Sequence, residues 1–441
     1  MRRRSFQTSY QWVILAVSFI VVAISYGQRF TFSVFLISLL EEFSWNRAQL
    51  SGVFSLNMIV CGVMSPIVGI LVDRFNAKQV ILVGACLFSL SLWLSSAIHS
   101  LWQYYLIYGI LGAVGFSLVA TVSQSKILVN WFEARGGMAI GVAFSGTGIG
   151  ILCLLPLSQF LILHLTWRGA YLILGLMIFV FIFILSALFQ KERPENRTFD
   201  KSGKQSQQEL QESFDNLQLV NKNWGLETWT LTKAVFTYQF WLLWVTCVLN
   251  GADVYCILVH HMAYLVDMGF DKMLASFMFG LTGIFATIGR GCSGSISDRI
   301  GREKTYILFQ VLVIISIFVL FALNKESPLF LLLLYGVLLG LGYGGVGPHV
   351  IAITVVDIFG RTSFGAIYGF AVLGFGIGNA IGPWLGGFLF DLMGNYRLVF
   401  LIAILNLSVS SLLFWIAAPR KIRIVIGKVP EELKKLGPAN K

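Results

Sequence analysis

Apolar runs of 20 or more residues recur along the whole chain and alternate with short polar segments. Each run is long enough to cross about 30 Å of hydrocarbon as one helix. The first run is too long for a signal-peptide core and has no small-residue cleavage site, so we predict a retained helix. We predict twelve spans, at residues 12–39, 49–72, 79–98, 102–129, 137–163, 169–189, 238–265, 274–297, 304–323, 328–356, 363–390 and 396–417.

The spans form two groups of six, separated by a polar stretch. We predict an N-terminal six-helix bundle at 1–189, a cytoplasmic linker at 190–236, a C-terminal six-helix bundle at 237–417 and a cytoplasmic tail at 418–441. The linker is rich in Gln and mixed charges and contains no span, so we expect it to be partly disordered. The expected fold class is an all-α polytopic membrane protein with both termini in the cytoplasm.

The two groups repeat one pattern. A Gly-x-x-x-Asp-Arg motif that ends at Asp73 and Arg74 recurs 225 residues later and ends at Asp298 and Arg299. Four glycines of the fifth span recur 228 residues later in the eleventh. Because each half has an even number of spans, both halves enter the membrane from the same side. Two parallel repeats with a site between them are typical of secondary transporters.

Composition and charge support a membrane protein and argue against a nucleic-acid partner. Of all residues 57% are hydrophobic and 12% are charged. The 32 Lys and Arg are unevenly placed: 24 lie in the termini and even-numbered loops, five in the odd-numbered loops and three within spans. This bias is the positive-inside signal. The net charge of +11 therefore reflects topology and an anionic inner leaflet.

Several kinds of site are not indicated. The six cysteines all lie in apolar spans without CxxC spacing, which predicts neither a disulfide framework nor a zinc site. The glycine-rich segments lie inside apolar spans, so we interpret them as surfaces for close helix packing and not as phosphate loops. We find no Walker motif, metal-ligand cluster or nucleophile–base pair, and expect no enzyme activity, no metal and no cofactor. An ion or solute gradient must then supply the energy.

The twelve spans, the linker after the sixth and the doubled motif resemble the major facilitator superfamily. Within it, the chain resembles the monocarboxylate transporters and the related oxalate/formate antiporters. Four stretches carry this resemblance: Leu40-Glu-Glu-Phe-Ser-Trp45, Asn130-Trp-Phe-Glu-Ala-Arg135, Gln239-Phe-Trp-Leu-Leu-Trp244 and Asp357-Ile-Phe-Gly-Arg361.

The resemblance implies a role for the doubled motif. Asp73, Arg74, Asp298 and Arg299 are expected to form an ionic latch, a set of charges that holds the two halves together on the cytoplasmic face in the outward-open state. The second copy follows the superfamily pattern, whereas the first has Asn76 where a glycine is usual. The alternative is a tight turn whose basic residues obey the positive-inside rule.

Arg290 lies in the cytoplasmic half of the eighth span. An arginine keeps its charge, so in a membrane it needs a cavity or a partner, and its planar fork matches a carboxylate. In the families that the chain resembles, an arginine eight residues before the loop aspartate binds the substrate carboxylate, and Arg290 has that position. An ion pair with Asp253 is the alternative. The chain has Ala286 where animal monocarboxylate transporters have an aspartate, and Phe375 where the antiporters have a lysine. These departures favour a monocarboxylate over a dicarboxylate.

Asp253, His260 and His261 in the seventh span are candidates for proton coupling. Burial and a nearby arginine act on a mid-membrane carboxyl in opposite directions, which suits a group that takes up a proton when an anion site changes. Histidine titrates near neutral pH and can relay protons. The alternatives are a neutral or paired Asp253 and histidines that lie in an outer vestibule.

Arg29, in the first span beside Tyr26, is a further candidate for substrate binding. The resemblance implies a substrate-contacting lysine at Phe30, one residue away, and we carry that role to Arg29. Pairing with an acid in the second half is the alternative. Asn57 and Tyr255 are candidate cavity-lining residues, with hydrogen bonds between helices as an equally good interpretation.

The predicted function is secondary active transport of a small monocarboxylate such as lactate or pyruvate, coupled to protons, by alternating access. Organic-anion exchange, efflux of hydrophobic solutes and a non-transporting membrane sensor stay open as alternatives. The expected partners are the substrate, protons and the lipid bilayer, with no nucleic acid. We expect a functional monomer in a bacterial inner membrane.

Overall fold

A computed structural model describes residues 2–132, 136–191, 224, 227–360, 363–417, 420 and 422, and this part of the chain contains helices and no strand. Eleven helical segments are long and apolar enough to cross a membrane. One of them, Met138–Phe189, has 52 residues and contains two of the predicted spans. Thr166 separates the two with a positive φ of 65°. The twelve predicted crossings are therefore all present.

The N-terminal half contains six crossings. The first crossing consists of α1 (Arg2–Phe30) and α2 (Phe32–Phe43), and the second is α3 (Arg47–Phe75). The third crossing is α4 (Ala77–Ser95). The fourth consists of α5 (Leu101–Tyr104), the π-helical η1 (Tyr105–Gly112), α6 (Ala113–Val119) and α7 (Thr121–Phe132). The fifth and sixth are α8 (Gly136–Ile178), the π-helical η3 (Phe179–Ile184) and α9 (Leu185–Phe189).

The C-terminal half contains the other six. It begins with the short α12 (Leu231–Val235), followed by α13 (Tyr238–Asp267), α14 (Lys272–Ile300) and α15 (Arg302–Ala322). The tenth crossing is α16 (Leu329–Gly345) with α17 (Pro348–Phe359), and the last two are α18 (Phe364–Met393) and α19 (Arg397–Ala417). The tenth crossing breaks where Pro348 follows Gly347, because proline lacks an amide hydrogen and disfavours a helical residue before it. Most of the predicted linker and tail lie outside the described residues.

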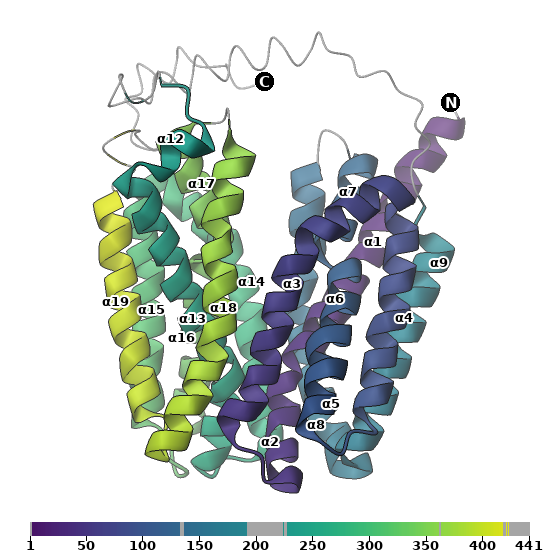
Figure 1. Cartoon of the computed structure of the whole chain (residues 1–441), viewed down its shortest axis with the longest axis vertical. Coiled ribbons are helices and arrows are strands. Elements are labelled where there is room, and N and C mark those ends of the chain that lie inside the picture. Colours follow the sequence, from purple (N-terminus) through teal and green to yellow (C-terminus); the bar gives the residue numbers. More distant parts are fainter. Residues whose placement is uncertain are drawn as a thin grey trace.

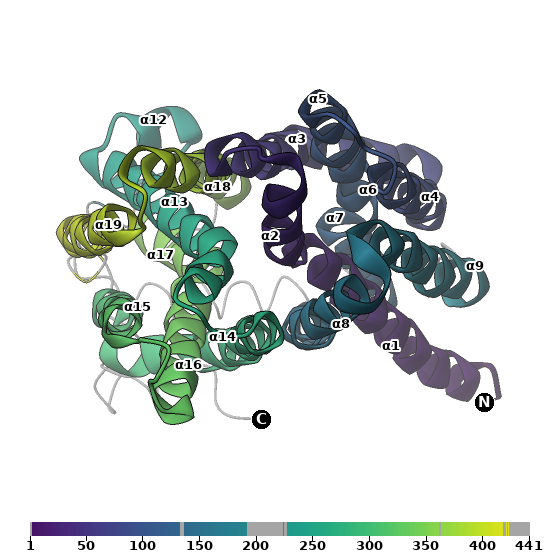
Figure 2. The ribbon, with the colours of Figure 1, turned by 90° about the horizontal axis from the view of Figure 1, so that it is seen from below.

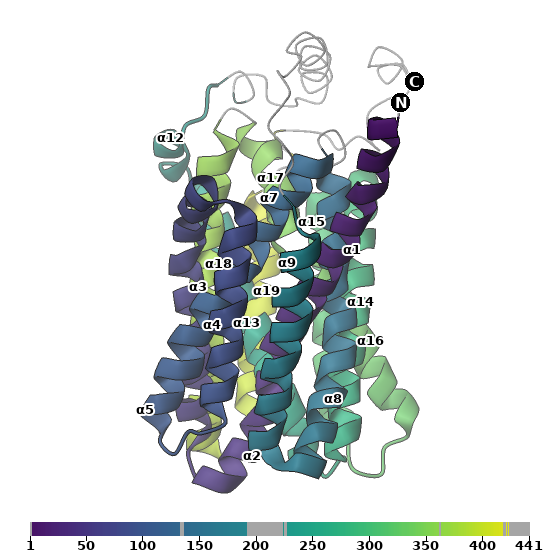
Figure 3. The same ribbon diagram turned by 90° about the vertical axis from the view of Figure 1, so that its right-hand side faces the viewer.

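The two halves stand side by side and approach each other at one end (Figure 1). Their ribbons diverge toward the end at which α1 begins and α19 ends, and come together at the opposite end (Figure 1). Seen from below, α8 lies beside α14 and α3 beside α18 at the boundary of the halves (Figure 2). The side view shows the helices of the N-terminal half running along the long axis of the molecule (Figure 3).

The repeated glycines pack helices within each half. A Cβ atom on Gly146 or Gly150 would meet a backbone carbonyl oxygen of α1, at 2.7 Å for Gly146. A Cβ atom on Gly374 or Gly378 would likewise meet a carbonyl oxygen of α13, at 2.7 Å for Gly374. Small residues let membrane helices approach this closely. The glycine repeat thus encodes the same contact in both halves, between spans one and five and between spans seven and eleven.

Candidate functional site

Arg29 is a buried cation in the first span, with 9% of its surface exposed. Its Nη2 donates a hydrogen bond to the Met58 sulfur at 2.8 Å, and its guanidinium carbon lies 4.3 Å from the centre of the Phe116 ring. Its Nε has no partner, and no carboxylate of the described chain pairs with it. The predicted alternative, an acid from the second half, is therefore absent from these residues. A guanidinium held by a thioether and an aromatic face keeps donors available for an anion.

Three further predicted residues gather near this cation. The charge of the guanidinium acts on Tyr26 and Tyr255, so these two rings from different halves share its surroundings. The hydroxyls of Tyr26 and Thr121 are hydrogen-bonded at 2.7 Å. Asn57 donates from Nδ2 to the Tyr108 carbonyl oxygen at 3.0 Å, which joins two spans. The structure thus brings together the predicted substrate-binding residues of the first, second and seventh spans.

Arg290 lies in α14 with its side chain exposed. Its guanidinium forms no hydrogen bond or ion pair with any described part of the chain. Its charge acts on Tyr343 of α16, and so does the charge of Arg29. The two arginines, one from each half, therefore share a neighbour at the boundary of the halves. Each is a cation without a counter-ion from the described chain.

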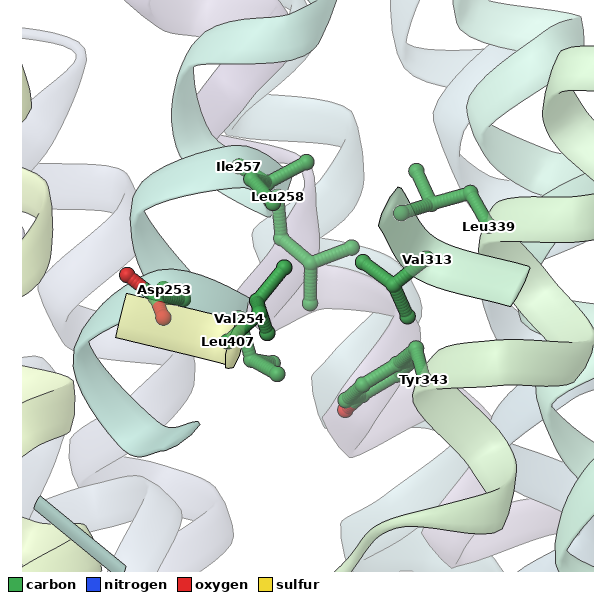
Figure 4. Close-up of a pocket in the computed structure, with 8 residues that line it drawn as sticks. All are labelled: Asp253, Val254, Ile257, Leu258, Val313, Leu339, Tyr343 and Leu407. Carbon is green, nitrogen blue, oxygen red and sulfur yellow. The ribbon is translucent and has the colours of Figure 1, made fainter. Parts of the chain in front are cut away.

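Asp253 is buried elsewhere, inside the C-terminal half. Its Oδ1 accepts a hydrogen bond from Asn406 Nδ2 of α19 at 3.1 Å, and its Oδ2 has no partner. It lines a small internal cavity, with room for about one water molecule. Apolar side chains of the C-terminal half separate it from Tyr343 across this cavity (Figure 4). The ion pair with Arg290 that the sequence left open does not occur.

The two histidines of α13 are fully buried and do not line an outer vestibule. His260 Nε2 donates to the Pro383 carbonyl oxygen at 2.8 Å and lies 3.3 Å from Ser51 Oγ of the N-terminal half. Its Nδ1 then accepts from the Tyr396 hydroxyl at 3.0 Å. His261 Nδ1 lies 3.0 Å from a carbonyl oxygen of its own helix, and its Nε2 has no partner. Their role in proton coupling remains a prediction.

Sequence reasoning missed His349, in the first turn of α17. Its Nε2 lies 2.8 Å from Ser293 Oγ, which lies 3.0 Å from the carbonyl oxygen of Arg290. The charge of Arg290 acts on its ring. The signal was a titratable residue inside a predicted span, after a Gly-Pro pair that breaks the helix. Its position beside Arg290 depends on the packing of α17 on α14, which periodicity does not give.

Among the described residues, the doubled motif makes ion pairs only within each half. Asp73 accepts from Lys126 of the same half. Asp298 and Asp357 both accept from Arg302, with Arg302 Nε at 2.8 Å from Asp357 Oδ2. The motif arginines, Arg74 and Arg299, form no ion pair in the described chain. In this conformation the predicted latch residues are thus separated into two sets.

The outer ends of the halves, by contrast, are joined by two crosswise ion pairs. Arg47 Nη2, at the start of span two, lies 2.7 Å from Asp267 at the end of span seven. Lys272 Nζ, at the start of span eight, lies 2.6 Å from Glu41 at the end of span one. The repeat relates the two pairs, because their basic members are 225 residues apart and their acidic members 226. The structure is therefore closed at its outer face.

A helix cap from the opposite half reinforces this closure. Asp391, at the outer end of α18, accepts hydrogen bonds from the backbone amides of Arg47 at 3.1 Å and Ala48 at 2.8 Å. These amides belong to the first turn of α3, where a carboxylate is favoured by free N–H donors and by the helix dipole. This cap joins a carboxylate of one half to backbone amides of the other, so it exists only while the outer ends are together.

The sequence matches the family model described as Major Facilitator Superfamily over residues 18–324 and 291–439. Curated relatives include monocarboxylate transporter 13 of Rattus norvegicus, 26% identical over 89% of this chain and 85% of the relative. Monocarboxylate transporter 2 of Homo sapiens is 24% identical over 88% of this chain and 81% of the relative. The uncharacterized MFS-type transporter YcxA of Bacillus subtilis is 22% identical, covering 91% and 94%.

Solved structures of low identity share the fold. One is a bacterial homologue of the human lysosomal transporter Spinster in an inward-facing, unoccupied conformation, with a TM-score of 0.71, 14% identity and coverage of 93% and 97%. Another is a mutant of the nucleoside transporter NupG, with a TM-score of 0.70, 15% identity and coverage of 93% and 100%. Such identities support the architecture of two six-helix bundles and carry no information on substrate.

Proposed function

Because the chain belongs to the major facilitator superfamily and its relatives include monocarboxylate transporters, we propose that it carries a small monocarboxylate, such as lactate or pyruvate, together with a proton. The observation that carries this proposal is the pair of arginines, Arg29 and Arg290, that lie near Tyr343 without a counter-ion in the described chain. We further propose that the protein acts as a monomer in a bacterial inner membrane.

The cost of the two cations supports anion binding. A charged side chain in the middle of a membrane costs at least about 2.5 kcal/mol. No acidic partner in the described chain offsets this cost for Arg29, and the guanidinium N–H groups of Arg290 make no hydrogen bond there. A carboxylate that binds between them offsets this cost and forms charge-assisted hydrogen bonds. The electrostatic interaction of Arg29 with Tyr26 and Tyr255 supports these two residues as lining of the same site, and the hydrogen bond of Asn57 to Tyr108 supports a role for Asn57 in holding it together.

A co-transported proton makes the movement of a monocarboxylate electroneutral. Asp253, His260 and His261 are the predicted proton carriers. Burial and the free Oδ2 of Asp253 support a carboxyl that can hold a proton. Its position behind apolar side chains means that it would act on the anion site through helix movement and not by contact.

Alternating access follows from two sets of charges that are used in turn. In the present conformation the outer face is held by Arg47–Asp267 and Lys272–Glu41. When these pairs separate, the cytoplasmic ends approach each other. Asp73, Arg74, Asp298 and Arg299 are then placed to form the cytoplasmic latch, with Asp73 and Asp298 exchanging their present partners.

Organic-anion exchange is a second candidate function. It is favoured by one observation, that no carboxylate of the described chain pairs with either arginine. An exchanger replaces one anion by another, so its site needs no group that accepts a proton.

Uptake into proteoliposomes tests these proposals. Labelled lactate should accumulate when an inward proton gradient is imposed, and Arg290→Ala should reduce this uptake at least tenfold. Arg168→Ala is a matched control, because Arg168 is an arginine that pairs with Glu42 in its own half. Uptake that does not depend on the proton gradient but requires lactate inside the vesicles supports exchange. Uptake by Arg290→Ala equal to that of wild type refutes the role of Arg290.

A further inference from the structure

His349 is the histidine that the structure places beside Arg290. The His349 ring is half-buried, whereas Ser293, its hydrogen-bond partner, is fully buried. A serine hydroxyl has one proton to donate. If Ser293 donates it to the Arg290 carbonyl oxygen at 3.0 Å, it must accept the N–H of His349 Nε2 at 2.8 Å. This arrangement fixes the neutral tautomer, with its proton on Nε2.

The same arrangement leaves the second ring nitrogen open. His349 Nδ1 makes no hydrogen bond within the described chain and is not among its buried unpaired atoms. A proton that binds at Nδ1 converts the imidazole to imidazolium without breaking the bond to Ser293. Because this unpaired nitrogen is not a buried atom, it is accessible to water. The ring can therefore gain and lose a proton with little rearrangement of its neighbours.

The charges around His349 come from a few groups. From α14, the positive charge of Arg290 acts on the ring. From α18, the Tyr368 hydroxyl donates to the carbonyl oxygen of Pro348, the preceding residue, at 3.3 Å. From α15, Arg302 faces α17 but is held by carboxylates, including Asp357 of α17 itself. Arg290 is therefore the one cation without a counter-ion in this surrounding, as far as the described residues show.

A cation beside a titratable ring couples proton binding to anion binding. While the site is empty, the charge of Arg290 disfavours a second positive charge on the neighbouring ring. A carboxylate bound to Arg290 cancels this repulsion and attracts the imidazolium. Each ligand therefore increases the affinity for the other by the same factor, as linkage requires. Release of either ligand promotes release of the other.

We propose that His349 carries the co-transported proton, which it binds at Nδ1 when a carboxylate occupies Arg290 and releases on the side where the carboxylate leaves. This inference rests on the proposed function of proton-coupled monocarboxylate transport. The two histidines of α13, His260 and His261, lie in buried contacts, and no arginine without a counter-ion contacts them in the described chain.

The experiment compares His349→Gln with wild type in proteoliposomes, using labelled lactate. His164→Gln is the matched control, because His164 is an exposed histidine of the N-terminal half. Two rates are measured for each protein: uptake driven by an inward proton gradient, and exchange against internal lactate without a gradient. An internal pH-sensitive dye records protons that enter with lactate.

We expect His349→Gln to reduce the gradient-driven uptake and the proton signal at least tenfold, while its exchange rate stays within about twofold of wild type. Retained exchange shows that the variant folds and binds lactate. Gradient-driven uptake equal to wild type overturns the inference and leaves the proposed function standing. Loss of exchange as well also overturns it, because His349 is then needed for binding or folding. Absence of lactate transport by wild type refutes the proposed function, and the inference with it.

Discussion

Replacement of Arg47 by methionine removes the best-connected side chain of the outer closure. Arg47 donates to Asp267 at 2.8 Å and to the Tyr396 hydroxyl at 2.6 Å, and its guanidinium lies 3.9 Å from the centre of the Phe390 ring. All three partners belong to the other half, so these contacts exist only while the outer ends are together. Methionine keeps the apolar stem and removes the charge. We expect Arg47→Met to shift the protein toward its outward-facing state.

The size of the shift follows from burial. The Arg47 side chain is 14% exposed and that of Asp267 is 39% exposed. Hydrogen bonds to charged groups contribute about 1.5–3 kcal/mol each, but Asp267 recovers water when its partner is lost. Burial raises the pKa of Tyr396, so its hydroxyl stays neutral and the arginine loses a hydrogen bond there and not a second ion pair. A net change of about 2 kcal/mol shifts the equilibrium about 30-fold.

The second crosswise pair provides an internal comparison. The Lys272 and Glu41 side chains are 30% and 59% exposed. An ion pair this exposed contributes about 0.5 kcal/mol, which is a factor of about two. Glu41→Gln should therefore shift the equilibrium far less than Arg47→Met, although the repeat places the two pairs in equivalent positions.

Chemical labelling of the outer gate measures the shift. Ser51 is fully buried in the closed outer face, 3.3 Å from His260. In a protein without its native cysteines, a cysteine introduced by Ser51→Cys reacts with a membrane-impermeant maleimide only after the outer face opens. We expect labelling to rise about 30-fold with Arg47→Met and about twofold with Glu41→Gln. Arg168→Met should leave it unchanged, because Glu42, its partner, lies in the same half.

Two results would refute this reasoning. Labelling of Arg47→Met at the rate of the Arg168→Met control would show that the outer contacts do not determine the equilibrium. An equal increase for Glu41→Gln and Arg47→Met would show that burial does not set the size of the effect.

Three further predictions follow from the same structure. Arg29→Gln removes a buried cation that has no acidic partner among the described residues. The Michaelis constant for lactate uptake should therefore rise at least tenfold, and an unchanged value would exclude Arg29 from the site. Gly148→Val places a Cβ atom 2.5 Å from a carbonyl oxygen of α14 across the halves, whereas Gly141 has open space. Maleimide labelling of the outer gate should therefore rise for Gly148→Val and not for Gly141→Val. Because His349 is the proposed proton carrier and Asp253 is bonded to Asn406 inside the C-terminal half, Asp253→Asn should keep gradient-driven uptake within a few-fold of wild type. Loss of that uptake with exchange retained would instead make Asp253 the carrier.

The sequence alone predicted the fold well because hydropathy is a local signal. The span predicted at 274–297 lies within α14, and that predicted at 79–98 overlaps α4 with a shift of a few residues. The break between α16 and α17 was missed, because apolar residues continue through it. Pro348 lies at the break, but a proline is found both in a span that only bends and in a span that divides into two helices, so composition does not distinguish them.

The site was predicted less completely because it depends on which helix faces meet. Asp253 and Arg290 are both charged residues in the middle of predicted spans, and nothing in periodicity separates an Asp253 that faces Arg290 from one that faces Asn406. Arg29 was found only through a neighbouring position of the resemblance, whereas the structure shows a buried cation with no counter-ion among the described residues. His349 depends on a contact between residues 56 apart in the chain.

The internal repeat also shows where the two halves had to differ. With the offset of 226 that relates Glu41 to Asp267, Arg29 corresponds to Tyr255, and with the offset of 225 that relates Asp73 to Asp298, Arg290 corresponds to Ser65. Each half therefore contributes one cation and a hydroxyl at the equivalent position. When the cytoplasmic ends approach each other, two like charges are brought closer in a medium of low dielectric, which opposes closure of the empty protein. A bound carboxylate removes this repulsion and attracts both halves. Substrate thus lowers the barrier to its own translocation, because the asymmetric charges lie across the boundary that moves.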